Sequence, residues 1–183
     1  MSDWTIAIIA ALALLYVAWT YNRLVVLRNR VANAWSQIDV QLRRRHDLIP
    51  NLVEAVKAYM AHERGVIEAV VEARRAAIAA GSDIAARASA ENGLGRSLHS
   101  LIALAEAMPQ LRASENMRDL QEELSSTENR VAFARQHYND SVTQYNTAIA
   151  SLPASLLAGL LGFGAKTLFL AAEAERQAPG MRF

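Results

Sequence analysis

The chain has 183 residues, of which 19 are Lys or Arg and 18 are Asp or Glu, giving a formal net charge of +1, and it contains no cysteine. This near-neutral balance argues against a general nucleic-acid binder, which usually carries a strongly basic stripe, so we expect no nucleic-acid partner. The lack of cysteine excludes disulfides, zinc–thiolate sites, iron–sulfur clusters and thiol nucleophiles.

The first expected element is a membrane anchor over residues 4–21, a stretch without charge. A helix of this length spans about 27 Å, close to the thickness of the hydrocarbon layer. Trp4 at one end and Trp19 and Tyr21 at the other suit the interfacial layers. A cleaved signal peptide would start with a positive charge and end at small residues, whereas this segment starts Met-Ser-Asp and ends Trp-Thr-Tyr-Asn-Arg. The pattern favours an uncleaved anchor.

Three arginines set the expected orientation of the anchor. Arg23, Arg28 and Arg30 follow it closely, and no Lys or Arg precedes it. The positive-inside rule then places residues 22–183 in the cytoplasm and the N-terminus outside; the alternative is a bundle outside the cytoplasm. We expect the same three arginines to contact lipid headgroups, each contributing about 1 kcal/mol near an anionic surface.

Helical periodicity continues beyond the anchor. Apolar residues recur at spacings of three and four over residues 24–42, so a first helix is expected to run on to His46. Asp47 is a good N-cap, and Pro50 is tolerated in a first helical turn, which favours a turn and a second helix from about Leu48. The alternative is a single helix kinked at Pro50.

A third helix is expected from near Ile84, after the stop and cap of residues 81–83, and is ended by Pro109. Gly93 and Gly95 weaken its middle by about 1 kcal/mol each relative to Ala. Small residues at these positions would let a neighbouring helix come close.

The fourth expected helix is capped by Ser114 and carries a regular seven-residue repeat. Its apolar positions are Leu124, Val131, Tyr138, Tyr145 and Leu152, alternating with Leu120, Thr127, Ala134 and Ser141. Such a seam packs as a helical bundle or a coiled coil. Residues 22–152 are dominated by Ala, Leu, Glu, Arg and Gln, without strand-like alternation. The predicted fold is all-α: an N-terminal transmembrane helix over 1–21 continues into an elongated antiparallel four-helix bundle over 22–152, followed by an apolar C-terminal tail over 153–183.

The tail begins PASLLAGLLGFGAKTLFL over residues 153–170, which is too interrupted for a second membrane span. An apolar segment of this kind usually covers a surface. We expect a contact with another subunit or with the membrane, and packing on its own bundle is the alternative. The predicted self-association residues are Leu156, Leu157, Leu160, Leu161, Phe163 and Phe169.

The histidines form no recognisable metal or catalytic motif. None of His46, His62, His99 and His137 has a Glu three residues before it, and the residue four after His62 is Val66. We interpret them as surface or helix-end residues and expect no catalytic residue, metal or cofactor. The run of residues 43–46, Arg-Arg-Arg-His, is interpreted as a cationic helix end that complements the helix dipole, the alternative being a phosphate or acidic-partner site.

Several stretches resemble the LemA family of bacterial membrane proteins. They are RLVVLRNRVANAWSQIDVQLRRRHDLIPNLVEAVK, then LAEAMPQLRASEN, LQEELSSTENRVAFARQHYND and QYNTAIASLP, with a looser match at GFGAKTLF and APGMRF. One departure is Met108, where an aromatic residue is expected. The resemblance implies an N-terminal anchor in a bacterial inner membrane and a helical-bundle domain. It implies no established biochemical activity and supplies no catalytic residues.

The expected function is therefore structural. We predict a membrane-anchored scaffolding protein without catalytic activity, whose partners are membrane lipid and further copies of itself. The alternative is an adaptor that presents its bundle to another membrane or envelope protein.

Overall fold

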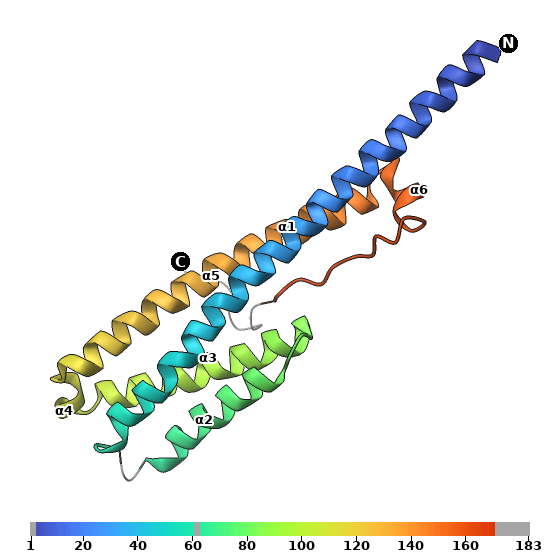
Figure 1. Ribbon diagram of the computed structural model, residues 1–183. Coiled ribbons are helices and arrows are strands. Elements are labelled where there is room, and N and C mark those ends of the chain that lie inside the picture. The colour runs from blue at the N-terminus through green and yellow to red at the C-terminus, as the bar shows by residue number, and fades with distance from the viewer. Residues whose placement is uncertain (1–2, 61–62, 171–183) are drawn as a thin grey trace, which may run out of the picture. The chain divides into compact units, whose positions relative to one another are not determined.

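The computed structural model describes residues 3–60 and 63–170, and this part of the chain is helical, without a strand. The helices are α1 (Asp3–Lys57), α2 (Arg64–Ala79), α3 (Ile84–Glu106), α4 (Pro109–Arg112), α5 (Glu115–Ala150) and α6 (Ala154–Ala158) (Figure 1). The predictions of an all-α protein and of one long apolar N-terminal helix are confirmed. His62 and residues 171–183 of the expected tail lie outside the described residues.

Helix α1 runs through Pro50 as one helix of 55 residues, so the predicted turn at Asp47 is wrong. Proline lacks the N–H that would bond to the carbonyl four residues earlier, here that of His46. The guanidinium of Arg74, on α2, donates from Nε to this carbonyl oxygen at 2.9 Å. A contact from another helix thus replaces the missing backbone bond. Pro50 itself is exposed, where its ring meets little resistance.

The chain divides into two compact units, each described here by itself. Unit 1 contains residues 3–37 and 136–168, and unit 2 contains residues 38–60, 63–135 and 169–170 of the described chain. This division by contact leaves the expected boundaries at residues 21 and 152 as predictions.

Unit 2 is built around an apolar core. The last part of α1 and helices α2 to α5 supply its buried side chains, which are Leu48, Ile49, Leu52, Val56, Met60, Val70, Ala77, Leu94, Leu98, Leu101, Ala105, Leu111, Met117 and Leu124. Two predicted helix starts are confirmed here. Asp83 accepts hydrogen bonds from the backbone N–H groups of Ala85 and Ala86 at 2.9 and 3.1 Å. Ser114 Oγ accepts from the N–H of Met117 at 3.4 Å.

The glycines of α3 do not serve close packing, contrary to the prediction. A Cβ added at Gly95 would meet nothing within 4 Å, and one at Gly93 would meet only the side chain of Arg96 at 3.9 Å. The two positions therefore lie in open space.

Unit 1 contains the first part of α1, the end of α5, α6 and the segment that follows it. The buried face of α5 follows the predicted seven-residue repeat through Tyr138 and Tyr145. The repeat fails at Leu152, which is 76% exposed. The reason is that α5 ends at Ala150, so Leu152 has left the helix.

The contact of Arg74 with the carbonyl of His46 generates a double-mutant test. We expect Arg74→Met to lower the free energy of unfolding by about 2 kcal/mol, because a buried carbonyl loses a charged donor. In a Pro50→Ala background the restored N–H of residue 50 bonds to the same carbonyl, so the loss is expected to fall by half or more. The measurement is urea unfolding in mild detergent, and equal losses in the two backgrounds would contradict this account.

Candidate functional site

Helix α1 carries one stretch long and apolar enough, by length and composition, to cross a membrane. Its best 18-residue window has a mean hydropathy of 1.8 and is only 6% buried. The exposed apolar side chains include Trp4, Ile6, Ile8, Ile9, Leu12, Leu14, Leu15 and Trp19. A continuous apolar surface of this size is unfavourable in water and marks a contact with lipid or protein. The stretch supports membrane association.

The predicted interfacial aromatics have different surroundings. Trp4 and Trp19 are exposed. Tyr21 is less so, because its ring packs edge-on against Phe163 with 5.7 Å between ring centroids. Phe163 belongs to the segment after α6, so this segment is fixed to α1 immediately beyond the apolar stretch.

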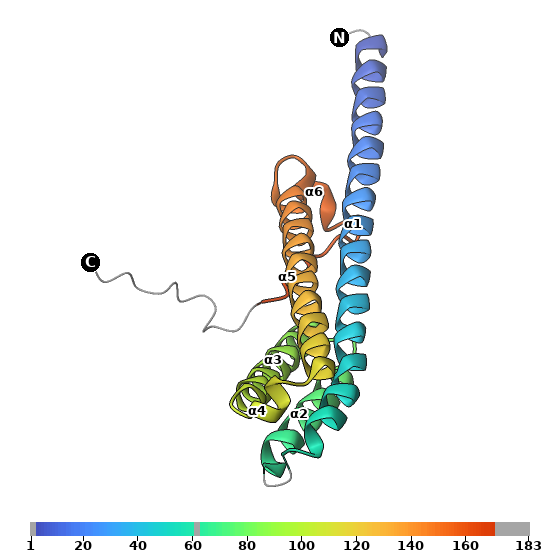
Figure 2. The same cartoon turned by 90° about the vertical axis from the view of Figure 1, so that its left-hand side faces the viewer.

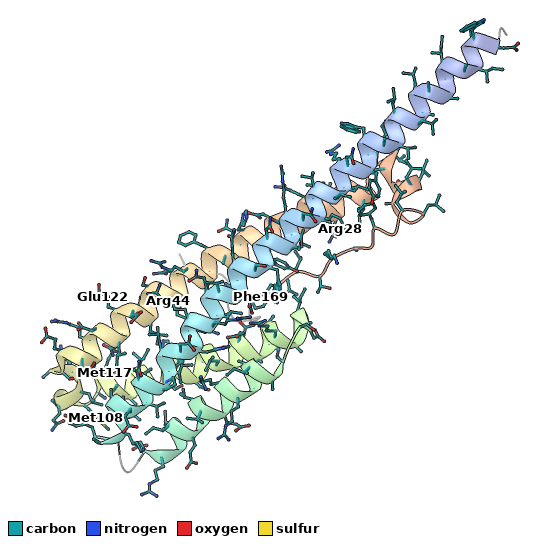
Figure 3. The ribbon with its side chains drawn as sticks, viewed as in Figure 1. Arg28, Arg44, Met108, Met117, Glu122 and Phe169 are labelled. Atoms are coloured by element: carbon teal, nitrogen blue, oxygen red, sulfur yellow. The ribbon has the colours of Figure 1, made fainter. Side chains whose placement is uncertain are left out.

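The three predicted lipid-contacting arginines are all exposed, but they do not share one environment. The guanidinium of Arg23 lies over the ring of Trp19, at 5.4 Å from its centroid. That of Arg28 lies over the ring of Phe163 at 5.3 Å (Figure 3). Arg30 instead lines a groove together with Arg23. Cation–π contacts of this kind leave the charge free to meet an anion from the solvent side.

Polar side chains of α5 hold the segment after α6 by its backbone (Figure 2). Tyr145 Oη donates to the carbonyl of Gly164 at 3.0 Å, and Tyr138 Oη donates to that of Thr167 at 2.8 Å. Asn146 pairs with both backbone groups of Lys166, donating from Nδ2 to its O at 2.8 Å and accepting from its N at 2.9 Å through Oδ1. Burial of the two phenols raises the pKa of both tyrosines, so they stay protonated donors at neutral pH.

This arrangement divides the six predicted self-association residues. Phe163 and Phe169 are 5% and 2% exposed in their own chain, so they are not available to a second copy and the alternative of packing on the same chain holds for them. Leu156 and Leu160 are exposed, and Leu157 and Leu161 are half-buried. Only the leucines therefore remain open to another molecule.

The run of residues 43–46 contains a buried charge cluster, and its interpretation as an exposed helix end is wrong. Arg45 donates from Nη1 to both carboxylate oxygens of Glu128 at 2.9 and 3.1 Å, and it forms an ion pair with Glu91. His46 Nε2 lies 2.9 Å from the other oxygen of Glu91. Arg45, His46 and Glu91 are each at most 6% exposed. The cluster joins α1, α3 and α5 within unit 2.

The histidine interpretation is therefore wrong for His46, whereas His99 and His137 are exposed as predicted. A signal for the cluster exists in the sequence. Glu91 precedes Leu94 and Leu98 by three and seven residues, which places a carboxylate on the apolar face of α3. A charge at such a position needs a buried partner.

Glu91 is ionised in this setting. Burial alone would raise its pKa, but the hydrogen bond from His46 and the charges of Arg45 and His46 outweigh burial and lower the pKa below its ordinary value of 4.5. A carboxylate held in this way is a weak base and is committed to its ion pairs. Among the described residues no group of three or more His, Asp or Glu side chains could hold a metal. The cluster is suited to fixing helices.

The sequence model of the LemA family matches residues 34–183. The chain is also similar to magnetosome protein MamQ of Magnetospirillum gryphiswaldense, at 26% identity, and to magnetosome proteins MamQ 2 and MamQ 1 of Paramagnetospirillum magneticum, each at 25% identity. Each match extends over 168 residues and covers 78% of this chain and 62% of the relative. The chain thus spans less than two thirds of the length of these relatives.

Two neighbouring arginines allow a matched test of the buried cluster. Arg45→Met leaves Glu91 buried without its cation and is expected to lower the free energy of unfolding by about 3–5 kcal/mol. The control is Arg44→Met, because Arg44 makes an exposed ion pair with Glu123 at 3.0 Å; its loss is expected to cost less than about 1 kcal/mol. Thermal or urea unfolding measures both, and similar losses for the two variants would contradict a special role for Arg45.

The lowered pKa of Glu91 generates a pH prediction. Its folded pKa lies below the ordinary value of 4.5, so its stabilising contribution is present above about pH 4.5 and is lost as pH falls through the folded pKa. Glu91→Gln is expected to be less stable than wild type at neutral pH, with a difference that narrows on acidification below pH 4.5. Unfolding curves measured across this range decide the point: a difference that stays constant with pH would be inconsistent with the assignment.

Proposed function

The chain belongs to the LemA family, and on that premise we propose that it is a membrane-anchored structural or scaffolding protein without catalytic activity. The observation that carries the proposal is the apolar stretch of α1, whose 18-residue window is only 6% buried. Residues 4–21 serve as the anchor in a bacterial inner membrane. The N-terminus lies outside and the helical domain in the cytoplasm, as the basic residues after the anchor favour.

A structural role is supported by the way the chain uses its charges. Its most buried ionisable groups are Arg45, His46 and Glu91, and all three are engaged with one another. Such a network fixes helices and leaves no ionisable group of the cluster free for proton transfer. The antiparallel four-helix arrangement over residues 22–152 forms part of this proposal, as the short joins between the helices favour it.

Self-association is the second part of the proposal, and the exposed leucines after α5 support it. Leu156 is 69% and Leu160 is 87% exposed, and they lie four residues apart around the short helix α6. Two such side chains on each copy form an apolar surface that a second copy can cover. In this proposal the protein forms homo-oligomers in the plane of the membrane.

An adaptor is the alternative function, and one observation in unit 2 favours it. A groove of about 760 Å³ lies between α1, α3 and α5, where charged side chains such as Arg96 and Arg135 lie beside the apolar Leu98 and Phe169. A groove with mixed lining fits a segment of another membrane or envelope protein. The adaptor role requires a partner in stoichiometric amount and little self-assembly.

The self-association proposal is tested by changing the leucines. Leu156→Asp combined with Leu160→Asp removes about 2 kcal/mol of apolar burial per side chain, so self-association is expected to weaken by at least about a hundredfold. Energy transfer between differently labelled copies in lipid vesicles measures the effect.

The matched control is Val40→Asp, which places the same charge at an apolar position that is 60% exposed in unit 2. It is expected to leave the energy transfer unchanged. If the double leucine variant also leaves it unchanged, or if wild-type copies show none, the leucines do not mediate self-association.

A further inference from the structure

We propose that a groove in unit 1 binds the headgroup of an anionic phospholipid. The groove has a volume of about 940 Å³ and lies between residues 16–30 of α1 and residues 143–154 at the end of α5 and the turn beyond it. Its volume falls within the range of ligand pockets, roughly 300–1,000 Å³. The inference rests on the proposed anchoring of residues 4–21 and identifies a lipid class and a place for it.

The groove starts inside the apolar stretch and ends in a cationic region. Tyr16 and Trp19 line its first part, with their ring centroids 6.1 Å apart. Arg23 and Arg30 line its further part, seven residues apart and so on one side of α1. An amphipathic lipid has the same order, with acyl chains in the hydrocarbon layer and a charged headgroup at its edge. The aromatic rings suit the boundary between the two.

The charge of the groove selects an anion. None of the described side chains that line it is acidic. Within residues 3–60 and 63–170, no carboxylate forms an ion pair with Arg23 or Arg30, in contrast to Arg45 or Arg87. Two guanidinium groups without a carboxylate partner, facing one groove, match the bidentate geometry that phosphate oxygens accept.

A buried hydroxyl gives independent support. Thr20 is 2% exposed and lines the groove, yet its Oγ1 has no hydrogen-bond partner among the described residues. Buried hydroxyls elsewhere in α5 bond to the carbonyl four residues earlier, as Thr127 and Ser141 do at 2.8 Å. The Thr20 hydroxyl is thus available as a donor to a ligand in the groove. A phosphate oxygen would satisfy it.

Apolar side chains complete the groove. Leu24, Leu27 and Leu152 line it beside the arginines. They suit the glycerol and first acyl carbons of a phospholipid better than a free phosphate ion, which would gain nothing from them. A second copy of the chain is the other candidate occupant, but it would have to bring an acidic segment to this position. The continuity of the groove with the membrane span favours lipid.

The test uses the full chain in nanodiscs made from equal amounts of phosphatidylglycerol and phosphatidylcholine. Native mass spectrometry of the released protein counts the lipids that stay bound. We expect retention of one phosphatidylglycerol in preference to phosphatidylcholine. Arg23→Gln combined with Arg30→Gln is expected to reduce this preference by about thirtyfold, since each basic side chain contributes about tenfold or slightly less. Thr20→Val is expected to reduce it while leaving the fold intact.

Two controls separate this site from general charge effects. Arg75→Gln combined with Arg118→Gln removes the same charge from two exposed positions of unit 2 and is expected to keep the preference. Arg28→Gln tests position, because Arg28 lies on the same helix but does not line the groove.

Three outcomes would overturn the lipid site. They are equal retention of both lipids by wild type, an equal loss in the groove variants and the charge controls, and displacement of the lipid by inorganic phosphate but not by chloride at equal ionic strength. Failure of the proposed anchoring is a different result. In that case the wild-type chain would not enter nanodiscs of either lipid and would sediment apart from them.

Discussion

The burial of ionised side chains inside a helical core is the constraint on which unit 2 depends. Arg45, His46 and Glu91 lie on faces that are otherwise apolar, and an isolated charge there would cost several kcal/mol. The pairing of Arg45 with Glu91 and Glu128 removes that cost only when α1, α3 and α5 keep their positions. The same stretch of α1 depends on Arg74, which supplies the donor that Pro50 lacks. Side chains from other helices therefore specify the path of α1.

Unit 1 is stabilised in a different way. Its tyrosines and Asn146 bond to backbone groups of the segment after α6, so the contact depends on the extended shape of that segment more than on its side chains. Phe163 adds the apolar part of the contact, against Tyr21 and Arg28. A segment fixed to α1 directly beyond the apolar stretch leaves the exposed leucines around α6 free for other surfaces. This is the physical basis for assigning contacts with lipid or further copies to this part of the chain.

Local signals in the sequence were sufficient for much of the fold. The caps at Asp83 and Ser114 and the seven-residue repeat of α5 depend on residues close in sequence, and the helices follow them. The path through Pro50 could not be predicted locally, because the compensating donor comes from a different helix.

The candidate site was only partly predictable. The buried cluster was missed, although Glu91 stands on an apolar helical face, because a run of arginines resembles a solvated helix end. The tail was misjudged at Phe163 because its partner, Tyr21, lies far away in sequence. The groove beside Arg23 and Arg30 requires the end of α5 and could not be inferred from one helix. Local chemistry therefore predicts elements, whereas contacts between distant segments decide which charges are buried.

The central claim is that the chain is a membrane-anchored scaffold that assembles with copies of itself. The most direct test is the molar mass of the full-length protein, extracted gently from its membrane and measured by light scattering with the detergent or lipid contribution subtracted. The account predicts a defined multimer of the 20.1 kDa chain. A species that stays monomeric across protein concentrations and mild lipid conditions would contradict it and would favour the adaptor role.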